Sequence, residues 1–187
     1  MPLLNKINNI QIIALLIIFG QGFFSFSQTK TFQIDPNKSQ VKFKVSHFGV
    51  LSVKGVFETF SGSILISENT LQKIKSEIQV SSINTNDTTR DDSLKDEAYL
   101  DVKNYPLITF NSTYIDLVSE TKIITGKLKI KGIEKHISMP FEMLKDGNYF
   151  HIKIITTIKR TDFNLDFGAM DSFVGDEIKL EILIITQ

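Results

Sequence analysis

Residues 90–110, RDDSLKDEAYLDVKNYPLITF, are the one helix-like interruption in a chain that otherwise alternates apolar and polar residues. From Asp91 the β-branched residues give way to Asp, Leu, Lys, Glu and Ala, and Leu94 and Ala98 fall at helical spacing. Asp91 is an acidic first-turn residue, and Tyr105-Pro106 ends the segment. The stretch predicts a short amphipathic helix at about residues 91–100 that covers a sheet structure and turns Leu94 and Ala98 inward.

Eight runs of alternating residues flank this segment, three before it and five after it. In the first run Val41, Phe43 and Val45 alternate with polar residues, as in a half-buried strand. Short turn signals such as Lys131-Gly132 and the Asp-Gly-Asn at 146–148 separate later runs, which is typical of an antiparallel meander. The runs lie within residues 41–45, 53–67, 73–80, 107–114, 122–131, 137–143, 152–158 and 177–185.

Eight meandering strands with one apolar face close most economically into a barrel, because closure removes both exposed edges. The sequence therefore predicts an all-β fold, an eight-stranded antiparallel up-and-down barrel with the short helix between strands 3 and 4. Such a barrel is either filled by side chains or hollow enough for one small ligand. The alternation of residues does not decide between these two interiors.

An outer-membrane barrel, with its apolar face toward lipid, would show the same alternation. Such barrels carry aromatic girdles at both membrane interfaces, whereas this chain has no tryptophan and ends Ile-Ile-Thr-Gln. The helix is also hard to place in an outer-membrane barrel. We therefore predict a soluble barrel with its many strand lysines on the outside.

The first 27 residues have the features of a signal peptide. Lys6 precedes an apolar run, IQIIALLIIF at residues 10–19, that is short for a membrane span. Ser25 and Ser27 are small residues at the two positions that signal peptidase reads, so cleavage after Ser27 is expected. The alternative, an uncleaved anchor, is disfavoured by the Gly-Gln-Gly interruption at 20–22. Residues 28–187 would then be a single periplasmic or secreted domain without a membrane span.

The composition argues against several classes of function. Basic and acidic residues balance at 21 each, whereas nucleic-acid-binding proteins usually have a basic excess. The absence of cysteine and the presence of only three histidines leave few ligands for a transition metal. No Gly-x-Ser-x-Gly elbow, Gly-rich phosphate loop or HExxH motif occurs. We therefore predict no nucleic-acid partner, metal, cofactor or catalytic residue.

Six motifs occur in order along the chain. They are Phe32-Gln33-Ile34-Asp35-Pro36-Asn37-Lys38-Ser39 leading to Ser46-His47-Phe48-Gly49, Gly55-x-Phe57-x-x-Phe60-Ser61-Gly62, Ser82-Ile83-Asn84-Thr85, Arg90-Asp91-Asp92-Ser93-Leu94, Tyr105-Pro106-x-Ile108-x-Phe110 and Arg160-Thr161-Asp162-Phe163. Together they resemble the YceI-like family over about residues 31–185. The resemblance implies an extended lipocalin-like barrel, periplasmic or secreted, that holds a long isoprenoid or similar lipid and has no catalytic residue.

The resemblance gives the inward-facing apolar residues a role as ligand lining, where the alternative is an ordinary core. The residues expected to line the ligand are Phe43, Val45, Phe57, Ile78, Leu94, Phe110, Leu128, Met139, Phe141 and Ile154. The five largest of the strand residues in this set, four phenylalanines and the methionine, are expected to point into one interior.

Four polar residues are candidates for contact with a ligand head group. Arg90 and Arg160 are the only arginines, and a guanidinium suits phosphate oxygens, although each also stands beside aspartate and would serve as a structural clamp. Ser93 stands where the family usually has histidine. His47 shares the inward parity of Val45, and a histidine there is either a pH sensor or simply hydrogen-bonded at the rim.

These observations predict a non-catalytic protein that binds, carries or sequesters a polyisoprenoid or fatty-acyl lipid. Two alternatives stay open, a filled barrel that acts through contact with a protein partner and an uncharacterised periplasmic enzyme. The exposed part of the sheet leaves homodimer formation open as well.

Overall fold

The computed structural model describes residues 28–187, so the predicted signal peptide lies outside the described residues. One antiparallel sheet contains eleven strands in the order β1-β4-β5-β7-β8-β9-β10-β11-β2-β3-β6. The strands are β1 (Thr29–Gln33), β2 (Gln40–His47), β3 (Leu51–Phe57), β4 (Phe60–Ser67), β5 (Thr70–Gln79), β6 (Ile83–Asn84), β7 (Leu107–Asp116), β8 (Ile123–Ile130), β9 (Ile133–Asp146), β10 (Tyr149–Lys159) and β11 (Val174–Ile185). The helices are η1 (Val80–Ser82), α2 (Thr88–Lys95), η2 (Thr161–Phe163) and η3 (Gly168–Phe173).

The eight predicted runs correspond to nine of the eleven strands, because the run at 53–67 is broken into β3 and β4, and the short strands β1 and β6 lie outside the predicted runs. Residues 34–39, which include Pro36, separate β1 from β2, and η1 separates β5 from β6. The break between β3 and β4 lies opposite η1, because the N–H groups of Glu58 and Thr59 donate to the carbonyl and the hydroxyl of Ser82, respectively. The predicted strand count is therefore too low, because alternation reveals neither the break at 58–59 nor the two short strands at 29–33 and 83–84, while the all-β antiparallel class is confirmed.

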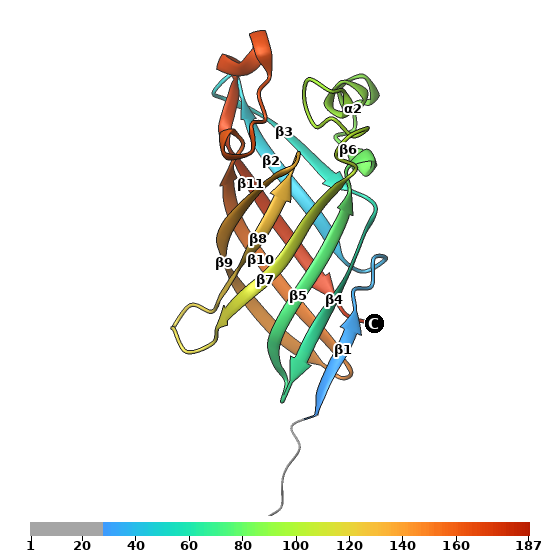
Figure 1. Ribbon diagram of the computed structural model, residues 1–187, viewed down its shortest axis with the longest axis vertical. Helices are drawn as coiled ribbons and strands as arrows, with labels where there is room; N and C mark the ends of the chain where they lie inside the picture. Colours follow the sequence, from blue (N-terminus) through green and yellow to red (C-terminus); the bar gives the residue numbers. More distant parts are fainter. Residues whose placement is uncertain (1–27) are drawn as a thin grey trace, which may run out of the picture.

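The pairing of the last run with the first closes the sheet into a barrel. Strand β11 pairs with β2, and β1 and β2 pair with β4 and β3, respectively. A bridge between Ile34 and Thr186 continues the closure where β1 and β2 are interrupted. In Figure 1, α2 and the orange-red segment that contains η3 lie at one end of the barrel, and the yellow β7–β8 loop lies at the other.

The two faces of the sheet are as predicted. Ile64, Leu71, Ile124 and Ile152 are at most 1% exposed and fill the end of the barrel away from α2. Burial of each such side chain contributes about 1.5–3 kcal/mol to folding. The exposed lysines on the outer face include Lys42, Lys44, Lys73, Lys75 and Lys129.

Two glycines make room for aromatic rings inside the barrel. A Cβ atom at Gly55 would overlap the ring of Phe43, and one at Gly126 would overlap the ring of Phe110. Both rings therefore lie flat against the wall instead of crossing the lumen, as aromatic side chains do over strand glycines in other curved sheets.

The helix differs from the prediction in its bounds and in the residues it buries. Helix α2 begins after Asp87, whose side chain accepts the Arg90 N–H at 3.0 Å as an N-cap, and it ends at Lys95. The chain then continues in turns, so helical spacing no longer applies and Ala98 is exposed. Within α2 the buried residue is Asp91, so the helix is not amphipathic as expected. No helix in residues 28–187 is long and apolar enough to cross a membrane.

Candidate functional site

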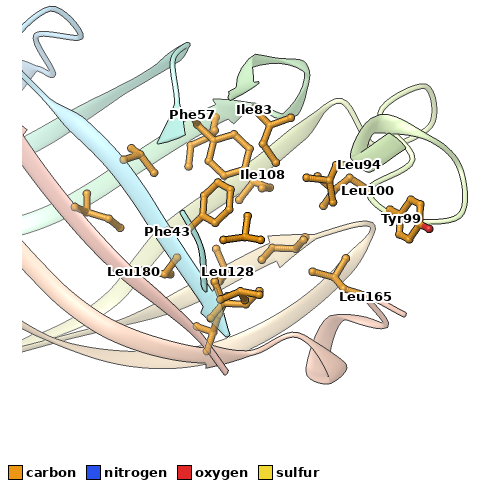
Figure 2. Close-up of a pocket in the computed structure, with 18 of the residues that line it drawn as sticks. Phe43, Phe57, Ile83, Leu94, Tyr99, Leu100, Ile108, Leu128, Leu165 and Leu180 are labelled. Atoms are coloured by element: carbon orange, nitrogen blue, oxygen red, sulfur yellow. The ribbon is translucent and has the colours of Figure 1, made fainter. Parts of the chain in front are cut away.

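An apolar cavity of about 430 Å³ occupies the end of the barrel nearer α2. Its walls come from β2, β3, β5 and β7 to β11, and Figure 2 shows Phe43, Phe57 and Leu128 around it. Buried Ile74 and Ile184 also line it, where it meets the filled half of the barrel. The sequence did not decide between a filled and a hollow interior. The barrel is filled by side chains at one end and hollow at the end nearer α2.

Nine of the ten residues predicted to line the ligand line this cavity. They are Phe43, Val45, Phe57, Ile78, Leu94, Phe110, Leu128, Met139 and Ile154. Phe141 does not, although it is only 5% exposed and belongs to the core cluster. It lies two residues beyond Met139 along β9, toward the filled end, so the shared parity correctly predicts its inward direction but not its depth.

The cavity opens between two segments that do not belong to the barrel wall. Leu94, Tyr99 and Leu100 lie on one side of the opening, and Leu165 lies on the other (Figure 2). The two sides meet where the rings of Tyr99 and Phe167 approach, with centroids 5.3 Å apart. Within residues 28–187 no hydrogen bond or ion pair joins these two segments, so this ring contact is what links them.

Arg160 does not line the cavity but holds the loop on one side of its opening. Arg160 is 4% exposed, and its guanidinium donates to the carbonyl oxygens of Leu165, Asp171, Val174 and Gly175 at 2.8–3.3 Å. It also bonds Asp171 Oδ1 at 2.6 Å, and this hydrogen bond and the Phe167 N–H hold the pKa of Asp171 below its usual value. With its N–H groups engaged in this way, the geometry favours the structural clamp over head-group contact.

Arg90 lines the cavity and at the same time fastens α2 to Thr85, the residue that follows β6. Its Nε donates to Thr85 Oγ1 at 2.8 Å and its Nη2 to the Thr85 carbonyl at 2.9 Å, while Nη1 lies 3.6 Å from Asp87. The Thr85 hydroxyl in turn donates to the buried carboxylate of Asp91 at 2.5 Å. These hydrogen bonds explain why the buried residue of α2 is the polar Asp91.

His47 and Ser93 also line the cavity near its opening. The His47 ring packs against Phe48, with centroids 4.3 Å apart. The Ser93 hydroxyl donates to the Thr89 carbonyl at 2.9 Å within α2. Of the four candidate head-group residues, the structure therefore brings three together around the cavity and leaves Arg160 outside it.

Sequence reasoning missed three residues that shape the site. Tyr99 and Phe167 form the ring contact across the opening, and nothing in the local pattern pairs these two loops. Ser76 lies on the inward face of β5 between Ile74 and Ile78, and its hydroxyl faces the otherwise apolar wall. The sequence did offer a signal for Ser76, because it is a polar residue at a position of the strand pattern that is otherwise apolar.

The polar side chains of the lining are His47, Ser76, Arg90, Ser93, Tyr99 and Asp166. Only Arg90 and Ser93, both on α2, share an element, and within residues 28–187 no hydrogen bond joins one of these six side chains to another. Nor do His, Asp and Glu side chains in this part of the chain form a group that could hold a metal ion. The arrangement suits an apolar ligand with its polar end, if it has one, at the opening.

Comparison with known proteins gives three kinds of likeness. The family model described as a YceI-like domain matches residues 32–185. A UPF0312 protein of Vibrio campbellii is 32% identical over 152 residues, which are 76% of this chain and 80% of the relative. The crystal structure of Burkholderia cenocepacia BcnA is 25% identical, with a TM-score of 0.76 over 82% of this chain and 99% of BcnA.

A more distant structure shares the fold. It is described as a polyisoprenoid binding domain from Saccharophagus degradans implicated in plant cell wall breakdown. Its TM-score is 0.69 at 15% identity, covering 83% of this chain and 97% of that domain. At this identity the likeness concerns the architecture of the barrel.

Proposed function

Because the chain belongs to the YceI-like family and encloses an apolar cavity, we propose that it binds a long apolar lipid, of polyisoprenoid or fatty-acyl type, inside the barrel. It carries or sequesters this lipid without catalysis, as a periplasmic or secreted protein. The observation that carries the proposal is the cavity itself, about 430 Å³ with walls formed almost wholly by apolar strand residues. That volume lies within the usual range of small-ligand pockets, about 300–1,000 Å³.

The energetics of such a site need no specific polar contact. Each methylene group that leaves water is worth about 0.8 kcal/mol, so a chain of ten buried carbons nominally gains about 8 kcal/mol. Ordering of the lipid and its lost mobility oppose part of this gain. The head group at the opening would then set the orientation of the lipid more than its affinity.

Two other functions have weaker support. The hollow half of the barrel disfavours a filled barrel that acts only through protein contact. An enzyme would need polar groups that converge on a reacting atom, whereas within residues 28–187 no hydrogen bond joins one polar lining side chain to another. The description of a protein of the same fold as a polyisoprenoid binding domain makes polyprenols the first ligands to test.

Titration of the delipidated protein with a polyprenol and with its phosphate tests both the function and the role of Arg90. We expect the unmodified chain to bind both lipids. Arg90→Gln removes the bonds to Thr85, so we expect a loss of about 1–2 kcal/mol in the free energy of unfolding and equal weakening for both lipids.

A selective loss for the phosphate would instead assign Arg90 to the head group, with an effect of about one to two orders of magnitude in affinity. Failure of the unmodified chain to bind either lipid, or a fatty acid, would contradict the proposed function. Calorimetry measures all of these affinities in one format.

The segment that follows α2 offers a matched test of the opening. Leu94 lines the cavity, whereas Ala98 is exposed four residues later. Leu94→Asp places an unpaired charge against apolar surface, so we expect lipid retention during gel filtration to fall at least tenfold, while Ala98→Asp leaves it unchanged. Equal retention in the two variants would mean that this segment does not close the cavity.

A further inference from the structure

A cluster of exposed apolar side chains lies at the end of the barrel where the cavity opens, on the side of β2, β3 and η3. The turn between β2 and β3 carries Phe48 and Val50, the latter 91% exposed, and Leu51 follows it. Phe173 joins them, since its ring centroid is 4.8 Å from that of Phe48 and its carbonyl accepts the Phe48 N–H. We call these four residues the apolar tip.

The backbone of this turn makes the cluster unusual. Phe48 has φ +51°, a left-handed conformation that is rare for a bulky side chain and is normally occupied by glycine or asparagine. Hairpin tips are also commonly polar. An aromatic residue that is held in this conformation and half exposed to solvent has a cost in stability, and such costs are concentrated at functional sites.

The apolar tip is continuous with the cavity lining. His47 lines the cavity and packs on Phe48, and Val174, which follows Phe173, lines it too. Exposed Met170 on η3 also belongs to the lining. The tip therefore adjoins the cavity lining at His47, Met170 and Val174.

A row of lysines lies on the outer face of the strands that carry the tip. Lys44 on β2 pairs with Lys54 on β3 and with Lys179 on β11, so three like charges stand directly opposite one another. Such neighbours repel, and none of the three makes an ion pair within the described residues 28–187. Glu181, two residues from Lys179, pairs with Lys42 instead. The three lysines are thus a basic row without ion pairs in the described residues, with Glu177 and Glu181 on either side of Lys179 along β11.

The distance between the row and the tip suits a membrane. Lys44 is four residues from Phe48, which is about 13 Å along the strand and about 10 Å along the axis of a barrel with tilted strands. If the tip enters a bilayer, the ammonium groups lie about one Debye length from the surface, where anionic headgroups attract them.

We propose that the apolar tip inserts into the surface of a lipid bilayer and that the lysine row favours bilayers with anionic headgroups. In this orientation the cavity opens toward the bilayer, and a lipid passes between the two without crossing water. The inference rests on the proposed function for the identity of the passenger. Docking itself needs only the tip and the lysine row.

The chain lacks tryptophan, so one introduced residue reports on docking. Val50→Trp places the reporter at the tip, and Val118→Trp is its matched control because Val118 is 96% exposed in the β7–β8 loop at the opposite end (Figure 1). Each variant is mixed with vesicles of phosphatidylcholine alone or with added phosphatidylglycerol. We expect the emission of the Val50→Trp variant to shift to shorter wavelength, most strongly with phosphatidylglycerol, and that of the Val118→Trp variant to stay unchanged.

The lysine row is tested in the Val50→Trp background. Lys44→Gln with Lys54→Gln should weaken binding to the anionic vesicles about fivefold per lysine, whereas Lys73→Gln with Lys75→Gln should leave it unchanged. No shift for Val50→Trp with either vesicle, or equal shifts at both ends of the barrel, would overturn the proposal. Equal effects of the two lysine pairs would overturn the role of the row.

A transfer assay separates failure of docking from failure of lipid binding. Val50→Asp should keep the lipid content of the unmodified protein, measured by native mass spectrometry, and should slow lipid transfer between vesicles at least tenfold. Val118→Asp should change neither. Unaltered transfer by Val50→Asp contradicts docking through the tip, whereas an absence of lipid from the unmodified protein contradicts the proposed function instead.

Discussion

Replacement of Arg160 by methionine is expected to lower the free energy of unfolding by about 3–5 kcal/mol, a large share of the 5–15 kcal/mol typical of a domain. Arg160 is 4% exposed, and its guanidinium satisfies four carbonyl oxygens as well as Asp171. Methionine fills part of the same volume but supplies none of the five hydrogen bonds that the guanidinium donates. Urea unfolding followed by circular dichroism measures the loss.

Arg90→Gln is the matched comparison, because its side chain is more than a third exposed and it should lose only about 1–2 kcal/mol. Arg160→Lys should not restore stability, since one ammonium group cannot reach acceptors that a planar guanidinium contacts from five N–H groups. A loss of less than about 1 kcal/mol for Arg160→Met would contradict the clamp.

Replacement of Ser76 by phenylalanine is expected to abolish lipid binding without unfolding the barrel. Ser76 is the small polar side chain in the strand wall of the cavity, so a phenyl group there occupies space that the ligand would use. Exclusion of only three methylene groups from the cavity forfeits about 2.4 kcal/mol, which is a loss of more than fiftyfold in affinity. Titration with polyprenol measures this loss.

The control uses the same substitution on the outer face of the sheet. Ser61 on β4 is exposed, and Ser61→Phe adds the same ring outside the barrel. We expect unchanged lipid affinity for Ser61→Phe and a thermal stability for Ser76→Phe at or above that of the unmodified chain, because the added ring is buried in apolar surroundings. Equal lipid affinity for the two variants would mean that the ligand does not occupy this cavity.

The parts of the fold that depend on alternation were predictable from the sequence. The inward direction of Phe43, Phe110 and Met139 follows from a side-chain period of two, and so does the outward direction of the lysines. The end of α2 was not predictable from the sequence. Capping by Asp87 and the hydrogen bonds from Arg90 to Thr85 hold the helix at residues 88–95, although the residues beyond Lys95 continue the helical spacing. The family was recognised from six short motifs, and the match to residues 32–185 confirms it.

The sequence predicted which side chains point into the barrel, but not how far along the barrel axis each one lies. Phe141 and Met139 share a face of β9, yet only Met139 reaches the cavity, since the barrel is filled at one end and parity carries no information about height. The contact between Tyr99 and Phe167 joins segments 68 residues apart and has no local signature. Arg160 was a candidate for head-group contact because a guanidinium suits phosphate oxygens. Its hydrogen bonds to carbonyl oxygens of the loop depend on how that loop folds back, which the sequence does not reveal.

Native mass spectrometry of the protein purified from its source tests the central claim most directly, because it detects a ligand that the cell itself supplied. We predict a population whose mass exceeds that of the chain by one lipid, which is released under denaturing conditions and identified in the extract as a polyisoprenoid or fatty-acyl compound. The Ser76→Phe variant expressed in the same cells should lack this population. A chain that is free of lipid when isolated, and that takes up none from its own membranes, would contradict the account.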